Sequence, residues 1–272
     1  MNDHGGGTAR TDQFGQMERA LRAKRATGRK LLVPYITGGL PGWEHALRAA
    51  VAAGADAIEI GIPFSDPVMD GPVIQQASQK ALDAGATPVS ILHEARALDV
   101  GVPLAVMTYY NTVHHAGHHR FAESLAAAGI VAAIVPDLPL DESGPWCSAA
   151  DDSGIETVML AAPTASDARL PRICDRARGF VYSVGLLGVT GERSTLAATA
   201  TALAARLKAI THTPVLVGVG VSNAAQAYEA VQVADGVVQG ASVMRRFLEA
   251  GPDAVGEYVA EVRAAIDRDE HR

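Results

Sequence analysis

Residues 31–62 read LLVPYITGGLPGWEHALRAAVAAGADAIEIGI, and this stretch contains the unit that decides the fold. Two short apolar runs, LLVPYI (31–36) and AIEIGI (57–62), flank an Ala-rich segment at 43–53 in which apolar residues recur at helical spacing. The two runs are nearly continuous in apolar character, which is typical of parallel strands covered on both faces. The stretch is therefore predicted to form a strand, a helix and a second strand.

The same unit repeats along the rest of the chain. Further strands are predicted at PLAVM (103–107), AAIVP (132–136), ETVML (156–160), FVYSV (180–184), PVLVGV (214–219) and GVVQG (236–240). Helices are predicted at 72–84, 88–99, 120–128, 142–153, 167–177, 196–210, 223–232 and 241–250, and at 13–27 and 253–267 toward the two ends. Eight such units in 272 residues predict an α/β fold, a (β/α)8 TIM barrel with extra N- and C-terminal helices. A doubly wound open sheet is the competing fold, but the GxGxxG turn that it needs after the first strand is absent.

Composition and charge limit the class of protein. Residues 1–10 are polar and Gly-rich and are expected to form a disordered tail, so that residues 11–272 make one barrel domain. We find neither the apolar core of a signal peptide nor an apolar stretch of about 18 residues. The net charge of −7, without a long basic run, argues against a nucleic-acid partner. Cys147 and Cys174 are expected to be reduced structural thiols of a cytoplasmic protein that has no membrane partner.

Glycine-rich segments follow the last three predicted strands, at 185–194, 218–224 and 239–243. Barrels that bind phosphate build the anion site from the loops after strands seven and eight and a nearby helix N-terminus. Gly191, Gly220 and Gly240 are therefore candidate phosphate-binding residues. One glycine of this kind is more often a tight turn, and the three together favour a phosphate site. The segment GLLGVTGERS (185–194) is also long enough to form a lid.

Acidic residues mark the strand at 57–62 and the loop after it. Glu59 lies within the apolar run, and Asp66 and Asp70 follow in the segment FSDPVMDGP (64–72). A carboxyl group near the top of a barrel strand is partly desolvated, which raises its pKa and suits it to move protons near neutral pH. Asp70 reaches over the same mouth, and two acids in different environments can hold different protonation states. The alternatives are a buried structural carboxylate for Glu59 and turn or cap residues for Asp66 and Asp70.

The segment EIGIPFSDPVMDGPVIQ (59–75) closely resembles the signature of the tryptophan synthase alpha subunit family. The resemblance continues with PYITGGLPG (34–42), MTYYN (107–111), IVPDLP (134–139), FVYSVGLLGVTGER (180–193) and VGVGVSNAAQA (217–227). It covers nearly the whole barrel, in the same order. It implies a retro-aldol cleavage of indole-3-glycerol phosphate to indole and glyceraldehyde 3-phosphate, with neither a metal nor an organic cofactor.

The resemblance also implies roles for individual residues. Glu59 takes the family's position for the proton shuttle, and Asp70 the position that bonds the indole N–H and steadies the developing positive charge. Tyr182 corresponds to an accessory aromatic close to Glu59, and Thr190 to the lid residue that contacts Asp70 on closure. The positions that line the family's indole pocket are Met107, Tyr109 and Ile134.

The sequence departs from the family pattern in two places. The family usually has Gly-Ser after strand eight, with the Ser helping to hold the phosphate. Here the order is Gly240-Ala241-Ser242, so the hydroxyl is shifted by one residue within the expected phosphate site. Before the lid, Leu186 and Leu187 stand where many relatives carry polar residues.

Members of the family usually pair with a PLP-dependent beta subunit, which receives the indole. The resemblance implies an alpha2beta2 complex, with Asn111, Asp137 and Pro139 facing the partner and PLP belonging to that partner alone. Asn111 is equally a residue type that occurs in simple turns. The segment HHAGHH (114–119) has spacings that could bind a metal, but no accompanying carboxylate or Cys pattern, and is expected to be a solvated loop or helix start.

Three other functions remain open at this point. The first is a stand-alone indole-3-glycerol phosphate lyase that releases free indole, which the two departures keep open. The second is a sugar-phosphate isomerase of the same barrel type, which also needs acid and base groups beside a phosphate site. The third is a non-catalytic subunit that activates a partner, although the presence of both Glu59 and Asp70 argues against it.

Overall fold

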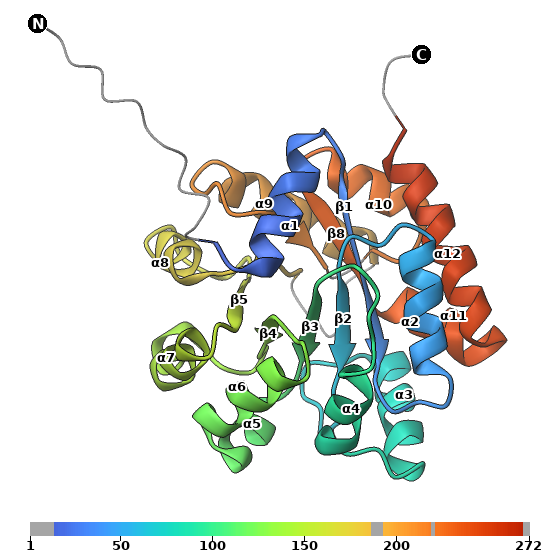
Figure 1. Cartoon of the computed structure of the whole chain (residues 1–272). Coiled ribbons are helices and arrows are strands. Elements are labelled where there is room, and N and C mark those ends of the chain that lie inside the picture. Colours follow the sequence, from blue (N-terminus) through green and yellow to red (C-terminus); the bar gives the residue numbers. More distant parts are fainter. Residues whose placement is uncertain (1–13, 186–192, 219–220, 269–272) are drawn as a thin grey trace, which may run out of the picture.

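The computed structural model describes residues 14–185, 193–218 and 221–268; the expected tail at residues 1–10 lies outside these ranges. Within them, parallel strands close into a barrel in the order β1 to β8, and helices surround it (Figure 1). The strands are β1 (Leu31–Thr37), β2 (Ile58–Gly61), β3 (Leu104–Met107), β4 (Ala132–Ile134), β5 (Glu156–Ala161), β6 (Val181–Ser183), β7 (Val215–Val217) and β8 (Gly236–Gln239). The predicted (β/α)8 barrel is confirmed.

The helices match the predicted segments to within a few residues, with one addition. They are α1 (Gln16–Ala26), α2 (Trp43–Ala52), α3 (Pro72–Asp83), α4 (Pro88–Ala95), α5 (Tyr110–Ala116), α6 (His118–Ala127), the 3-10 turn η2 (Leu140–Glu142), α7 (Gly144–Asp152), α8 (Arg169–Arg176), α9 (Arg193–Lys208), α10 (Ala224–Val231), α11 (Ala241–Ala250) and α12 (Pro252–Ile266). The added helix is α5, which Gly117, at φ +87, separates from α6. No helix in the described ranges is both long and apolar enough to cross a bilayer.

Alternation along the strands fills the barrel in layers. In a strand, every second side chain faces the same side. One inward-facing layer consists of apolar residues, one from each strand or its edge: Val33, Ala57, Ala105, Ala132, Val158, Phe180, Leu216 and Val238. Adding two to each number gives the next layer, nearer the carboxyl ends of the strands. The side chains of that layer therefore form the floor and walls of the barrel mouth.

Helix α1 closes the opposite, amino-terminal end of the barrel. Met17 and Leu21 are fully buried against the interior layer. The carboxylate of Glu156, at the start of β5, accepts the main-chain N–H groups of Met17 (2.6 Å) and Glu18 (3.0 Å). These two N–H groups belong to the first turn of α1, where a helix has no partners of its own, so Glu156 fixes the helix to the barrel.

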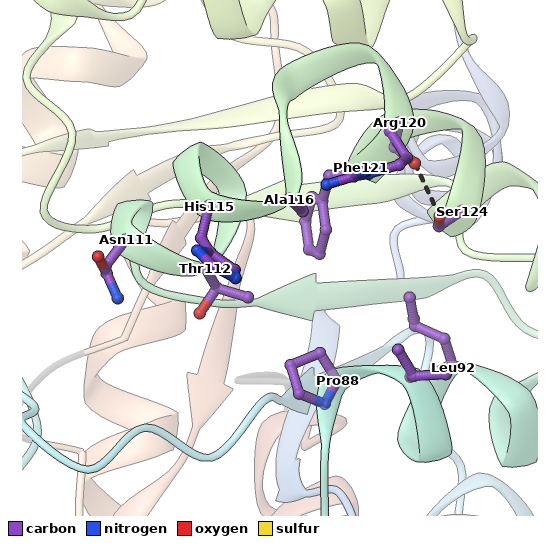
Figure 2. Close-up of a pocket in the computed structure, with 10 residues that line it drawn as sticks. Pro88, Leu92, Asn111, Thr112, His115, Ala116, Arg120, Phe121 and Ser124 are labelled. Atoms are coloured by element: carbon purple, nitrogen blue, oxygen red, sulfur yellow. Dashed lines mark hydrogen bonds between the residues drawn. The ribbon is translucent and has the colours of Figure 1, made fainter.

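Helices α4, α5 and α6 leave a groove on the outer surface (Figure 2). Its volume is about 570 Å³. Pro88 and Leu92 come from α4, Asn111 and His115 from α5, and Phe121 from α6. None of its described lining residues is a carboxylate.

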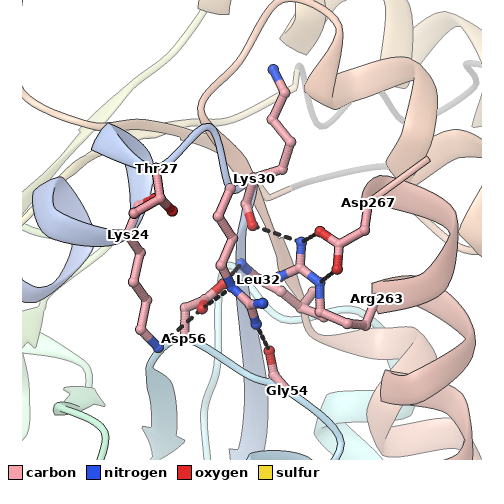
Figure 3. A network of polar contacts seen from close by, with 9 residues as sticks. Lys24, Thr27, Lys30, Leu32, Gly54, Asp56, Arg263 and Asp267 are labelled. Atoms are coloured by element: carbon pink, nitrogen blue, oxygen red, sulfur yellow. Dashed lines mark hydrogen bonds and ion pairs between the residues drawn. The ribbon is translucent and has the colours of Figure 1, made fainter. Parts of the chain in front are cut away.

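A buried ionic network ties α1, β1 and α12 together at the amino-terminal end (Figure 3). The side chain of Asp56 has no exposed surface and accepts from Arg29 (2.8 Å), from Arg263 (3.0 Å) and from the main-chain N–H of Leu32 (2.9 Å). Lys24 lies 3.0 Å from the same carboxylate. The amino-terminal face of a barrel of this kind serves stability, so the catalytic groups are to be sought at the other end.

Candidate active site

A cavity of about 380 Å³ opens at the carboxyl ends of the strands. Each strand supplies one wall residue, either from within the strand or from one residue beyond its end: Tyr35, Glu59, Met107, Ile134, Leu160, Tyr182, Gly218 and Gly240. These are the residues two positions beyond the buried interior layer, so the period of the strands alone aims them at the mouth. Glu59 is the only carboxylate among these eight.

Glu59 is held in the middle of the ring by the pairing of its strand. It lies opposite Tyr35 of β1 and Ala105 of β3, and its side chain is 2% exposed. Within the described part of the chain, its Oε2 atom is buried and has no hydrogen-bond partner. Burial, and secondarily the charge of Asp70, raise the pKa of Glu59 from 4.5 to about 8. Glu59 is therefore a carboxylic acid that keeps its proton at neutral pH.

Asp70 reaches the same cavity from the loop between β2 and α3. Burial raises its pKa above the ordinary value, and a hydrogen bond from the Tyr109 hydroxyl works in the opposite direction. The Asp70 carbonyl accepts from the Gln75 side chain at 2.8 Å, which holds the loop against the first turn of α3. Asp66 is exposed and accepts from the neighbouring Ser65 hydroxyl, as expected of a turn residue.

Two buried phenols flank Glu59. Desolvation raises the pKa values of Tyr35 and Tyr182, and the charges of Asp70 and Glu59 add to the effect, so both hydroxyls keep their protons. The Tyr182 ring takes the space beside Gly218, where an added Cβ would come within 2.1 Å of the ring. The Tyr35 hydroxyl fills the corresponding space over Gly61. Tyr35 was not among the predicted site residues, because an aromatic residue in an apolar strand reads as ordinary core.

Apolar side chains form the rest of the wall. Met107 and Ile134 line the cavity, as does Leu160 of β5, which the sequence did not single out. Other lining residues that the sequence did not single out are Met69, Ile74, Pro136 and Ala162. Tyr109 is not among the lining residues: it is 2% exposed, its ring stacks on Phe64 with centroids 5.2 Å apart, and its hydroxyl contacts the loop that carries Asp70.

The late glycine segments meet on one side of this cavity. Gly218, Val221, Ser222, Gly240 and Ala241 all line it, so the ends of β7 and β8 lie beside the start of α11. Thr190, Gly191 and Gly220 lie outside the described residues, as do Leu186 and Leu187.

Ser242 is placed differently from Ala241. It is buried, does not line the cavity, and donates its hydroxyl to the Gln239 side-chain oxygen at 2.7 Å. Tyr258 of α12 donates to the same oxygen at 2.6 Å. Of the two residues after Gly240, the one with the hydroxyl therefore points into the protein, and the alanine faces the cavity.

The three residues expected to face a partner lie together beyond β3 and β4. Asp137 accepts the main-chain N–H of Tyr110 at 2.9 Å, at the start of α5. Asn111 is the next residue, exposed at the edge of the groove in Figure 2, and Pro139 is exposed just before η2. None of the three lines the cavity.

The histidine-rich segment belongs to an aromatic cluster between α5, α6 and α7. The Nε2 atom of His118 lies 3.0 Å from the Tyr110 hydroxyl, and its ring lies 6.4 Å from that of Trp146. Across the described residues, no three His, Cys, Asp or Glu side chains gather as a metal site would require. Cys147 and Cys174 are both buried and unpaired with each other.

Comparison with known proteins agrees with this geometry. A family model described as tryptophan synthase alpha chain matches residues 21–268. A relative named tryptophan synthase alpha chain from Thermobifida fusca is 44% identical, over 92% of this chain and 97% of its own length. One from Streptomyces coelicolor is 45% identical, over 87% and 89%. A solved chain of Mycobacterium tuberculosis tryptophan synthase superposes with a TM-score of 0.87 at 36% identity, covering 94% of this chain and 100% of that one. The chain therefore belongs to the tryptophan synthase alpha chain family.

Proposed function

We propose that this chain cleaves indole-3-glycerol phosphate into indole and glyceraldehyde 3-phosphate, with Glu59 moving the protons. The family to which the chain belongs consists of carbon–carbon lyases of tryptophan biosynthesis. The single observation that carries the proposal is the environment of Glu59, a carboxylic acid with a pKa of about 8, alone in an apolar ring and facing a second acid.

The reaction needs one group to act first as an acid and then as a base. Protonated Glu59 gives its proton to C3 of the indole, which becomes an indoleninium ion. The Glu59 carboxylate then takes the proton of the side-chain hydroxyl next to C3. As that C–O–H becomes an aldehyde, the C–C bond breaks, and its electron pair returns to the indoleninium and regenerates neutral indole. A raised pKa suits both steps, because acid and base strength are then matched near neutral pH.

Asp70 stabilises the charge that this sequence creates. An ionised carboxylate that accepts the indole N–H opposes the positive charge that develops on the ring, and it does so most strongly in a cavity shielded from water. The two acids thus hold different protonation states, Glu59 neutral and Asp70 ionised. Tyr182 serves as an accessory wall beside Glu59, and Thr190 of the lid is proposed to contact Asp70.

The rest of the cavity suits the two ends of this substrate. Met107 and Ile134 offer an apolar surface to the indole ring. Gly240 and Ala241, at the N-terminus of α11, are proposed to offer main-chain N–H groups to the phosphate, together with Gly191 and Gly220. Because the Ser242 hydroxyl is engaged by Gln239, Ser242 contributes to this site through its main chain only.

We further propose that the chain works with a tryptophan synthase beta subunit in an alpha2beta2 complex in the cytoplasm. Asn111, Asp137 and Pro139 would face that subunit, and their placement outside the cavity is compatible with this role. The proposed reaction needs no cofactor in this chain, since the indole itself becomes the electron sink. PLP belongs to the partner.

Indole release from indole-3-glycerol phosphate tests the proposal. Wild type, Glu59→Gln and Asp70→Asn are compared at pH 7, with Asp66→Asn as a matched control because Asp66 lies in the same loop and is exposed. Glu59→Gln is expected to lose about 10² to 10⁴ in rate or more, because one residue serves both proton transfers. Full activity in Glu59→Gln would overturn the assignment.

The same assay separates the other functions. A strong acceleration by a beta subunit supports the two-subunit enzyme, whereas a fast rate indifferent to the partner indicates a stand-alone lyase. Absence of indole with turnover of a sugar phosphate indicates an isomerase. Tight partner binding without any indole from the native chain indicates a non-catalytic subunit.

A further inference from the structure

We propose that Tyr109 is a positioning residue for Asp70: its hydroxyl holds the loop between β2 and α3 so that the Asp70 carboxylate faces Glu59. The proposal rests on the proposed role of Asp70 and adds a residue that does not line the cavity. Tyr109 lies two residues after the C-terminal end of β3 and is 2% exposed.

The contacts of Tyr109 reach the loop at three points, Phe64, Met69 and Asp70. Its ring stacks on Phe64, with centroids 5.2 Å apart and planes at 27°. Its hydroxyl oxygen accepts the main-chain N–H of Met69 at 3.0 Å. The same hydroxyl acts on the Asp70 side chain and lowers the pKa of that carboxyl. One phenol therefore connects the beginning of the loop, its last turn and the acid itself.

The direction of these bonds is chemically consistent. Burial raises the pKa of the Tyr109 hydroxyl, so it keeps its proton and remains a donor. Its oxygen accepts the Met69 N–H, which leaves its proton available for Asp70, and a phenol has both capacities. Phenylalanine at this position would keep the ring and the Phe64 stack but lose the hydrogen bond from Met69 and the interaction of the hydroxyl with Asp70.

The Tyr109 hydroxyl favours the ionised form of Asp70. Among the described residues, the titratable groups that interact electrostatically with Asp70 are Glu59 of β2, Tyr35 of β1, Tyr182 of β6 and Tyr109 itself, and none is a cation. Tyr109 is the only one of these that lowers the pKa of Asp70, while burial raises it. Without the Tyr109 hydroxyl, Asp70 would ionise at higher pH.

The variant Tyr109→Phe tests this inference through the pH dependence of indole release. We expect kcat to fall roughly 10-fold or more, and the acid limb of the pH profile to move to higher pH, since the hydroxyl that lowers the pKa of Asp70 is lost. KM should change little, because Tyr109 does not touch the cavity. Tyr110→Phe is the matched control: its hydroxyl bonds His118 among the outer helices, and its profile should match wild type.

Comparison with Asp70→Asn separates this inference from the proposed function. If Asp70→Asn is fully active, the role of Asp70 fails. If Asp70→Asn is inactive while Tyr109→Phe keeps the wild-type kcat and acid limb, only the role of Tyr109 fails. The double variant should be no slower than Asp70→Asn alone, because Tyr109 acts through Asp70; a multiplied loss would overturn the inference.

Hydrogen exchange gives a second measurement that does not depend on the variant folding well. In the wild-type protein the Met69 amide, in a partly exposed loop, should be protected by its bond to Tyr109. Exchange of that amide at the rate of an unbonded loop residue would overturn the inference.

Discussion

The stability of the Glu59→Gln variant relative to the wild type should increase as the pH rises, although the variant loses activity. The folded pKa of Glu59 is about 8, against an ordinary value of 4.5. Below pH 4.5 the carboxyl is neutral in both the folded and unfolded chains, so its contribution to stability is fully present. Between pH 4.5 and pH 8 the unfolded chain ionises while the folded chain keeps the proton, and the stability of the wild type falls.

The magnitude follows from the gap of about 3.5 between the two pKa values. At about 1.4 kcal/mol for each pKa unit, the full loss is roughly 5 kcal/mol, of which about 3 to 4 kcal/mol falls between pH 5 and pH 8. Gln does not titrate, so the free-energy difference between the variant and the wild type should grow by that amount over this range. Its value at pH 5 also contains the cost of burying the Gln amide, about 1–3 kcal/mol, which does not depend on pH.

Urea unfolding at pH 5, 6, 7 and 8 measures this difference, with fluorescence of the buried Trp43 and Trp146 as the signal. The exposed Asp66 provides a control, because Asp66→Asn should follow the wild type at every pH. Parallel stability curves for Glu59→Gln and wild type would refute the reasoning. They would mean that Glu59 ionises at the same pH in both states and is not a neutral acid in the cavity.

Three other predictions concern the rate, the phosphate side of the cavity and the stabilising network. In the wild type, kcat should fall as the pH rises through about 8, because Glu59 then loses the proton that it must donate; a rate still rising at pH 9 would contradict this. Ala241→Ser places a hydroxyl on the cavity wall and should lower KM about 10-fold. Ser242→Ala should leave KM unchanged and lower stability by about 1 kcal/mol, because the hydrogen bond to Gln239 is lost. Equal effects of the two variants on KM would contradict the assigned orientations. Asp56→Ala removes the buried carboxylate shared by Lys24, Arg29 and Arg263, although Arg263 keeps its ion pair with Asp267, and should cost about 3 kcal/mol in urea unfolding. The kcat per folded molecule should stay the same, and a loss under about 1 kcal/mol would show that the network does not stabilise the barrel.

The fold could be predicted because its signal is local. Each parallel strand is covered on both faces and reads as a continuous apolar run, and the helices between them carry the helical period. The exceptions are short or polar elements. Helix α5 was missed because its seven residues include a histidine pair and end at Gly117, and the helix predicted at 88–99 ends at Ala95.

The position of Glu59 was also visible in the sequence, since an acid in an apolar strand contradicts its surroundings. Tyr35 gave no such signal, and for Tyr109 the family resemblance implied a place in the indole pocket. Tyr35 reads as a core aromatic, and only the packing shows that it lines the cavity beside Glu59, while Tyr109 lies outside the cavity lining and reaches the Asp70 loop.

The sequence by itself determined the eight strands, the helices that cover them and the acid that interrupts the second strand. The tertiary structure alone decided the environment of that acid, the direction of the Ser242 hydroxyl and the partners of Asp56. The physical reason is that strand and helix periods depend on neighbours in the sequence, whereas desolvation and hydrogen-bond partners depend on residues brought together from distant strands. Glu59 has the ordinary carboxyl pKa of 4.5 in the unfolded chain, and closure of the barrel around it raises that pKa to about 8.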